Sequence, residues 1–164
     1  MAHDGAVATT AAAPKSETVN GGDETILVVE DEISLLELVR NILQRYHYRV
    51  LIASSGVEAL RVWDEQDGRI DLVLTDMIMP GGVTGSDLAT ELKKRKPGLK
   101  IVITSGYSSE LVGKDFGQGE TAFLPKPYQP HQVARMIRET LDAVSKNQRQ
   151  PVPVPSNGMH TLAA

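Results

Sequence analysis

The feature that most constrains the fold of this chain is a regular alternation of short apolar runs with longer segments of helical periodicity. Five runs rich in branched apolar residues are predicted to be strands: 25–29, 49–53, 70–75, 100–104 and 121–124. Apolar residues recur at helical spacing in the segments that follow them, and the connections are short. This repetition is typical of an α/β fold with one doubly wound parallel sheet and helices on both faces.

The helical segments differ in the strength of their signals. The first has an expected apolar stripe of Leu35, Leu38, Val39, Ile42 and Tyr46. Ser55, with Glu58 three residues later, predicts a capping box that opens the second helix. Residues 108–116 predict only a weak helix, because few of them are apolar, and Pro130 is expected in the first turn of the last helix.

Composition excludes several classes of protein. The 164 residues carry a formal net charge of −4, which disfavours a nucleic-acid-binding surface. The absence of cysteine excludes disulfides, thiolate zinc sites and thiol catalysis. No apolar stretch is long enough to cross a membrane, and the alanine-rich start is a poor signal peptide, so we expect a cytoplasmic protein that binds neither nucleic acid nor membrane.

The two ends of the chain differ from its middle in composition. Residues 1–22 and 146–164 offer little to bury, and the second of these segments contains alternating prolines, so both are predicted to be disordered tails. The predicted folded domain therefore spans residues 23–145. The residues after it are too few for a DNA-binding output domain.

Polar residues gather where the predicted strands end. They are Glu30, Asp31 and Glu32 after the first strand, Asp76 after the third, Ser105 after the fourth and Lys126 after the fifth. Because the carboxyl ends of parallel strands meet at one edge of a sheet, we expect these side chains to converge. Closely packed acids favour a divalent cation such as Mg²⁺. There Asp76 can serve as a nucleophile that forms an acyl phosphate, and Ser105 and Lys126 can hold phosphoryl oxygens.

Each of these features has a common structural explanation when it occurs alone. Acidic residues after a strand often lie at the start of a helix, where the helix dipole favours them. A single Asp at a strand end is as often a turn residue, and a single Lys is usually solvated. Their joint occurrence after four strands of one predicted sheet is what indicates a functional site.

Four segments resemble the response-regulator receiver domains of two-component signalling. They are ILVVEDE at 26–32, DLVLTDMIMP at 71–80, TSG at 104–106 and LPKPY at 124–128. The resemblance covers essentially the whole predicted domain, and it is nearest to receivers attached to hybrid histidine kinases. It implies a flavodoxin-like (βα)5 fold with the five strands in the order 2-1-3-4-5.

The resemblance also implies roles for individual residues. Asp76 is the expected phosphoacceptor, and Mg²⁺ is expected on Asp31, Asp76 and the main-chain carbonyl of Ile78, with Glu30 acting through water. Ser105 is the switch hydroxyl that moves toward the phosphoryl group, Lys126 is its ion-pairing partner, and Phe123 is the switch aromatic residue. The Lys126–Pro127 peptide bond is expected to be cis.

The expected function is that of a phosphorylation-dependent signalling switch. A histidine kinase or histidine phosphotransfer protein is the expected partner, and the downstream protein target is not indicated. The chain is expected to dephosphorylate itself slowly and not to be an enzyme in the usual sense. An alternative is that it is a receiver domain excised from a hybrid histidine kinase.

Two alternatives from other classes are weaker. A Mg²⁺-dependent aspartyl phosphatase of the haloacid-dehalogenase type needs a second Asp two residues after its nucleophile, where this chain has Ile78. A receiver fold used only as an interaction module is expected to lose Asp31, Asp76 or Lys126, and all three are present.

Overall fold

The computed structural model describes residues 19–106 and 121–143, in which strands and helices alternate as predicted. The elements are β1 (Thr25–Val29), α1 (Ile33–Arg45), β2 (Arg49–Ala53), α2 (Gly56–Glu65), β3 (Leu72–Asp76), α3 (Gly85–Arg95), β4 (Lys100–Ser105), β5 (Thr121–Pro125) and α4 (Pro130–Asp142). The expected helix over 108–116, residues 1–18 of the expected N-terminal tail and the whole expected C-terminal tail lie outside the described residues.

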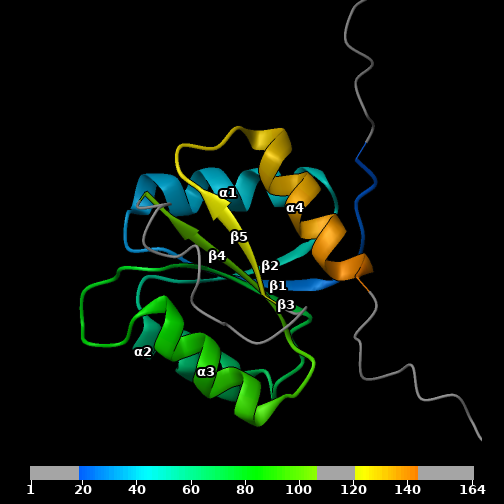
Figure 1. The fold of residues 1–164 in the computed structure, drawn as a ribbon. Helices are drawn as coiled ribbons and strands as arrows, with labels where there is room; N and C mark the ends of the chain where they lie inside the picture. The colour runs from blue at the N-terminus through cyan, green and yellow to red at the C-terminus, as the bar shows by residue number, and fades with distance from the viewer. Residues whose placement is uncertain (1–18, 107–120, 144–164) are drawn as a thin grey trace, which may run out of the picture.

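The five strands form one parallel sheet in the order β2-β1-β3-β4-β5, which confirms the predicted fold class (Figure 1). The register pairs Val29 with Thr75, and Asp76 with Thr104. Consequently the carboxyl ends of β1, β3 and β4 lie at one edge of the sheet. The residues that follow these strands are therefore brought together.

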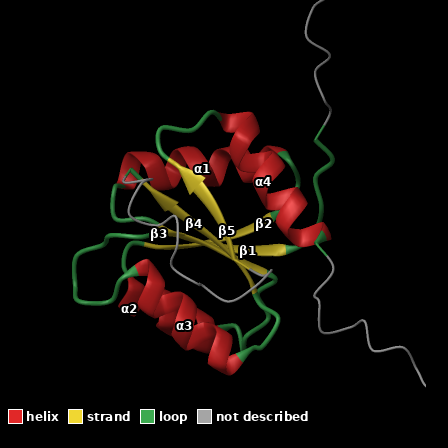
Figure 2. Cartoon of the chain, viewed as in Figure 1, coloured by secondary structure: helices red, strands yellow, loops and turns green. Residues whose placement is uncertain are grey.

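Helices cover both faces of the sheet, with α2 and α3 on one side and α1 and α4 on the other (Figure 2). Alternate strand residues belong to separate apolar cores. In β4, Ile101 and Ile103 pack in the core that includes α2 and α3, whereas Val102 packs in the core that includes α1 and α4. Burial on both faces explains why the strands are continuous apolar runs.

The predicted apolar stripe of the first helix includes one exposed residue, Leu38, and omits two buried ones, Leu36 and Leu43. The residues of α1 that are buried are Leu36, Val39, Ile42 and Leu43, and Leu38 remains 49% exposed. Leu38 lies two residues after Leu36, about 200° around the helix, so it points away from the sheet. The sequence pattern did not distinguish the buried side of the stripe from its exposed flank.

The second helix begins at the predicted cap, but with a different reciprocal contact. The N–H of Glu58 donates to the side chain of Ser55, as expected for an N-cap. The Glu58 carboxylate accepts from the N–H and the hydroxyl of Ser54 instead of closing the box on Ser55. A full capping box occurs at α3, between Thr84 and Asp87.

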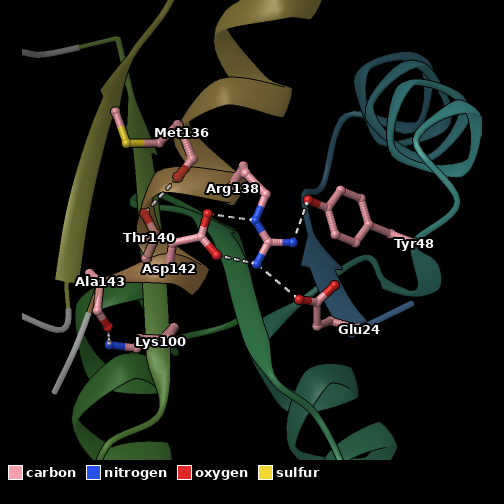
Figure 3. A network of polar contacts seen from close by, with 8 residues as sticks. All are labelled: Glu24, Tyr48, Lys100, Met136, Arg138, Thr140, Asp142 and Ala143. Atoms are coloured by element: carbon pink, nitrogen blue, oxygen red, sulfur yellow. Dashed lines mark hydrogen bonds and ion pairs between the residues drawn. The ribbon is translucent and has the colours of Figure 1, made fainter. Parts of the chain in front are cut away.

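Polar contacts fasten the end of α4 to the amino-terminal ends of the strands (Figure 3). Nη2 of Arg138 lies 3.0 Å from Glu24, which precedes β1, and 2.6 Å from Asp142. Nζ of Lys100, at the start of β4, donates to the main-chain oxygen of Ala143 at 2.6 Å. These contacts hold α4 at the edge opposite the polar strand ends. None of the helices in the described part of the chain is long and apolar enough to span a membrane.

Candidate functional site

Three carboxylates meet at the carboxyl edge of the sheet, as the sequence predicted. Glu30, Asp31 and Asp76 each offer an oxygen, and these oxygens all lie within 4.8 Å of one another. Glu30 follows β1 directly and is buried, Asp76 is the last residue of β3 and is partly buried, and Asp31 is exposed. Short connections after parallel strands therefore place acids from two strands around one point.

Lys126 projects into this acidic cluster from the turn after β5. Its Nζ lies 2.9 Å from Oε2 of Glu30 and 3.3 Å from Oδ2 of Asp76. The backbone N–H of Lys126 donates to the main-chain oxygen of Ser105 at 2.8 Å, which ties the turn to the end of β4. The Lys126–Pro127 peptide bond is cis, as expected.

Backbone groups hold Asp76 in place. Its Oδ1 accepts from the N–H of Met77 at 2.8 Å, and the same N–H lies 2.9 Å from the main-chain oxygen of Thr104. The buried hydroxyl of Thr75 donates to the main-chain oxygen of Asp76 at 3.0 Å. Oδ2 is the oxygen of Asp76 that faces Lys126.

Gly85 contributes to the site in a way that the sequence reasoning missed. Its N–H donates to the main-chain oxygen of Met77 at 2.9 Å. A Cβ atom at position 85 would lie 2.1 Å from the main-chain oxygen of Asp76, far inside any possible contact. The start of α3 can therefore approach Asp76 only because residue 85 has no side chain.

The other predicted site residues lie nearby, with different degrees of exposure. Ser105 ends β4 and is buried, and Phe123 of β5 pairs with Ile103 and packs against the core on the α2–α3 side. By strand alternation, Ser105 and Phe123 are on the same face of the sheet. Ile78 follows Asp76 by two residues, and the residue is 61% exposed.

Burial and charge perturb the titration of the cluster. Burial raises the pKa of Glu30, and the hydrogen bond from Lys126 offsets only part of this effect. Burial opposes the charged form of Lys126, but its contacts with Glu30 and Asp76 outweigh burial, and the pKa of Lys126 is raised. In the Glu30–Lys126 pair, burial disfavours the charged form of the acid, whereas the neighbouring carboxylates stabilise the charged form of the lysine.

Tyr128 is a second residue near the site to which sequence reasoning gave no role. It packs against the core on the α1–α4 side. Burial raises the pKa of its hydroxyl, and the negative charges of Glu30 and Asp76 add to the effect. Tyr128 belongs to the LPKPY segment that resembles receiver domains, but nothing in that segment indicates that its hydroxyl lies near the acids.

The chemistry of the cluster fits a divalent cation. Three carboxylates and one ammonium group leave a net charge of −2 when all are ionised. All the carboxylate ligands are hard oxygens, the kind that Mg²⁺ prefers. The exposed carboxylate of Asp31 gives an ion access from solvent.

Comparison with known proteins identifies the family. The model for the response regulator receiver domain matches residues 26–138. The chain belongs to this family. Receiver domains belong to two-component systems, generally act as phosphoacceptors, and bind Mg²⁺ at an acidic cluster.

Curated relatives of this receiver domain are longer proteins. The sensor kinase CckA of Brucella abortus (strain 2308) is 36% identical over 122 residues, which are 74% of this chain and 13% of the kinase. The transcriptional regulatory protein GlrR of Escherichia coli (strain K12) is 32% identical over 119 residues, which are 71% of this chain and 26% of the regulator. The chain thus spans only a minor part of either relative.

Solved receiver domains share the fold over nearly their whole length. The receiver domain of the hybrid histidine kinase CckA has a TM-score of 0.61 at 32% identity, with coverage of 71% of this chain and 98% of that one. The response regulator protein TrrA from Thermotoga maritima, in complex with Mg²⁺-BeF, has a TM-score of 0.63 at 28% identity, with the same coverages. The expected likeness to hybrid-kinase receivers is confirmed.

Proposed function

We propose that this receiver domain accepts a phosphoryl group on Asp76 from the phosphohistidine of a histidine kinase or histidine phosphotransfer protein, in a Mg²⁺-dependent reaction in the cytoplasm. The observation that carries the proposal is the position of Asp76. Its carboxylate ends β3 at the carboxyl edge of the sheet, lies in an acidic cluster, and has the ammonium group of Lys126 3.3 Å from Oδ2.

The transfer forms one bond and breaks another. A carboxylate oxygen of Asp76 attacks phosphorus in line, and the bond from phosphorus to the histidine nitrogen breaks, so that the nitrogen leaves with the electron pair. The hydrogen bond from the N–H of Met77 orients the carboxylate, and Lys126 stabilises negative charge on the phosphoryl oxygens. A Mg²⁺ ion held by Asp31, Asp76 and the main-chain carbonyl of Ile78 would supply further charge neutralisation.

The same arrangement supports a switch. In the proposed sequence, the hydroxyl of Ser105 moves toward the new phosphoryl group, and the ring of Phe123 rotates into the space that it leaves. Ser105 and Phe123 are on the same face of neighbouring strands, which makes such a concerted movement sterically reasonable. The change of charge at Asp76 then shifts the equilibrium between two conformations of the domain surface.

The proposed product is an acyl phosphate that is hydrolysed slowly, without enzymatic turnover. Ile78 has no proton to donate at the position where an aspartyl phosphatase would need its second acid. The kinase and the downstream target are proposed only by class. The role fits a stand-alone regulator as well as a receiver of a hybrid kinase.

Labelling with a small acyl phosphate donor tests this function. With Mg²⁺ present, intact-protein mass spectrometry should show one added phosphoryl group, and Asp76→Asn should abolish it. Asp67→Asn is a matched control, because Asp67 is an exposed acid of the α2–β3 connection. Undiminished labelling of Asp76→Asn would show that the phosphoacceptor is misassigned.

A further inference from the structure

The loop between β3 and α3 is fastened to the domain at both of its ends. Near its start, Met79 is buried in the core on the α2–α3 side. At its end, the N–H of Gly85 donates to the main-chain oxygen of Met77 at 2.9 Å. Ile78, whose main-chain carbonyl is the expected metal ligand, lies between Met77 and Met79. The path of the loop therefore decides where this carbonyl lies.

The middle of the loop lacks such contacts. Gly81 and Gly82 are exposed and have positive φ angles of 100° and 83°. A Cβ atom at either position would have no heavy atom within 4 Å. The next residue, Val83, is partly buried and packs against the same core as Met79. Val83 is thus the residue at which the loop returns to the body of the domain.

Gly56 provides the surface against which Val83 packs. Gly56 is the buried first residue of α2. A Cβ atom at position 56 would lie 2.6 Å from Cγ1 of Val83, 2.7 Å from its Cβ and 3.0 Å from its main-chain oxygen. Ordinary contacts between carbon atoms are about 3.5–4.0 Å. The first turn of α2 and the loop therefore fit together only because residue 56 has no side chain.

A short path leads from this contact to the expected metal ligand. Val83 is followed by Thr84, the N-cap of α3, and then by Gly85. The hydrogen bond from Gly85 reaches Met77, which is bonded covalently to Ile78. Because closely packed protein interiors transmit strain, a displacement of Val83 should reach the carbonyl of Ile78 along this path.

We propose that Gly56 and Val83 are positioning residues for the metal: their contact holds the loop so that the carbonyl of Ile78 can bind Mg²⁺ together with Asp31 and Asp76. Neither residue has a side chain that could bind an ion, so their effect on Mg²⁺ must pass through the loop. Loss of a group that orients metal ligands typically weakens metal binding by about 10- to 100-fold. The proposal rests on the proposed function.

Magnesium titrations of matched variants test this role without any reaction. Val83→Ala removes the two methyl groups of the packed side chain, and Gly56→Ala forces the loop away from α2. Val57→Ala is the control, because Val57 is the next residue of α2 and is 58% exposed. In titrations followed by amide NMR signals, the first two variants should bind Mg²⁺ about tenfold more weakly than the parent, and Val57→Ala within about twofold of it. Thermal unfolding checks that each variant is folded at the titration temperature.

Labelling at low and at saturating Mg²⁺ separates positioning of the metal from general damage to the fold. With the small acyl phosphate donor, Val83→Ala should react about tenfold more slowly than the parent at low Mg²⁺. At saturating Mg²⁺ its rate should approach that of the parent, because only binding of the ion is impaired. Adding Gly56→Ala to Val83→Ala should weaken Mg²⁺ binding less than Gly56→Ala does alone, because the closest overlap is then absent.

Different results overturn different claims. Binding of Mg²⁺ by Val83→Ala and Gly56→Ala as tightly as by the parent would refute the positioning role, and so would an equal loss in Val57→Ala. A labelling rate of Val83→Ala that stays low at saturating Mg²⁺ would also refute it. A parent protein that binds Mg²⁺ but is never labelled would instead refute the proposed phosphoryl transfer and leave the role of the loop contact intact.

Discussion

Gly85 allows the sharpest prediction about how the fold creates the site. Replacing it with Ala puts a Cβ atom 2.1 Å from the main-chain oxygen of Asp76 and 3.0 Å from its carbonyl carbon. Both neighbours are backbone atoms, so no side-chain rotation relieves the overlap. Either the first turn of α3 or the segment after β3 must move by about 1 Å to reach an ordinary contact distance.

The steric clash and the helix propensity predict opposite changes in the free energy of unfolding for Gly85→Ala. Gly85 is the first residue of α3, and Ala in a helix is favoured over Gly by about 1 kcal/mol. Overpacking against backbone costs typically 1–3 kcal/mol, and the severity of this overlap places Gly85→Ala near a net loss of about 2 kcal/mol. For a chain of this size that lowers the midpoint of thermal unfolding by roughly 4–8 °C.

Circular dichroism during heating measures the stability, and the labelling rate reports the geometry at Asp76. A displacement of about 1 Å at the acceptor should slow labelling by up to roughly 100-fold. Gly106→Ala is the control, because a Cβ there has no heavy atom within 4 Å. A Gly85→Ala variant that is as stable as the parent and labelled as fast would refute the close-approach argument.

Three further predictions concern residues around the fold and the site. Arg138→Leu leaves the partly buried Glu24 without its cation and should reduce the free energy of unfolding in urea by about 1–2 kcal/mol. Tyr128→Phe should lose less stability than the parent as the pH rises through about 10, because the raised pKa of Tyr128 keeps the folded state from forming the phenolate. Ile78→Asn should speed loss of phosphate from Asp76 several-fold, because an amide at this exposed position can orient water.

Each of these predictions has its own control or contrary result. Arg135→Leu removes an exposed ion pair with Glu139 and should cost less than about 0.5 kcal/mol, so an equal loss in both arginine variants would contradict the Arg138 argument. If the parent and Tyr128→Phe lost stability equally above pH 10, the raised pKa of Tyr128 would be contradicted. For Ile78, the control is Ile78→Leu. If the Asn and Leu variants lost phosphate from Asp76 at equal rates, the argument that an amide at position 78 orients water would be refuted.

The layered fold was predictable because its signals are local and repeated. Continuous apolar runs such as 25–29 can be buried on both faces only in a parallel sheet covered on both sides. The acids and the lysine could then be placed by one rule, that the carboxyl ends of parallel strands share an edge. Asp76 and Lys126 meet for this reason, although fifty residues separate them.

The features that could not be predicted depend on tertiary geometry. Nothing in the sequence distinguishes Leu38 from Leu36 until the helix is docked on the sheet. The requirement for glycine at position 85 arises from the backbone of a different segment, and no local pattern reports it. The contact of Glu30 with Lys126 likewise depends on side-chain reach across the sheet, whereas the resemblance assigned Glu30 only to the metal.

Chemical trapping of the phosphorylated residue tests the central claim most directly. An aspartyl phosphate is reduced by borohydride to homoserine: one hydride attacks the acyl carbon and phosphate leaves, and a second hydride reduces the resulting aldehyde to the alcohol. After labelling with Mg²⁺ and the acyl phosphate donor, peptide mass spectrometry should find homoserine at position 76, with none in unlabelled protein. Homoserine at another aspartate, such as Asp31, or labelled protein that yields no homoserine, would contradict the assignment of Asp76 as the phosphoacceptor.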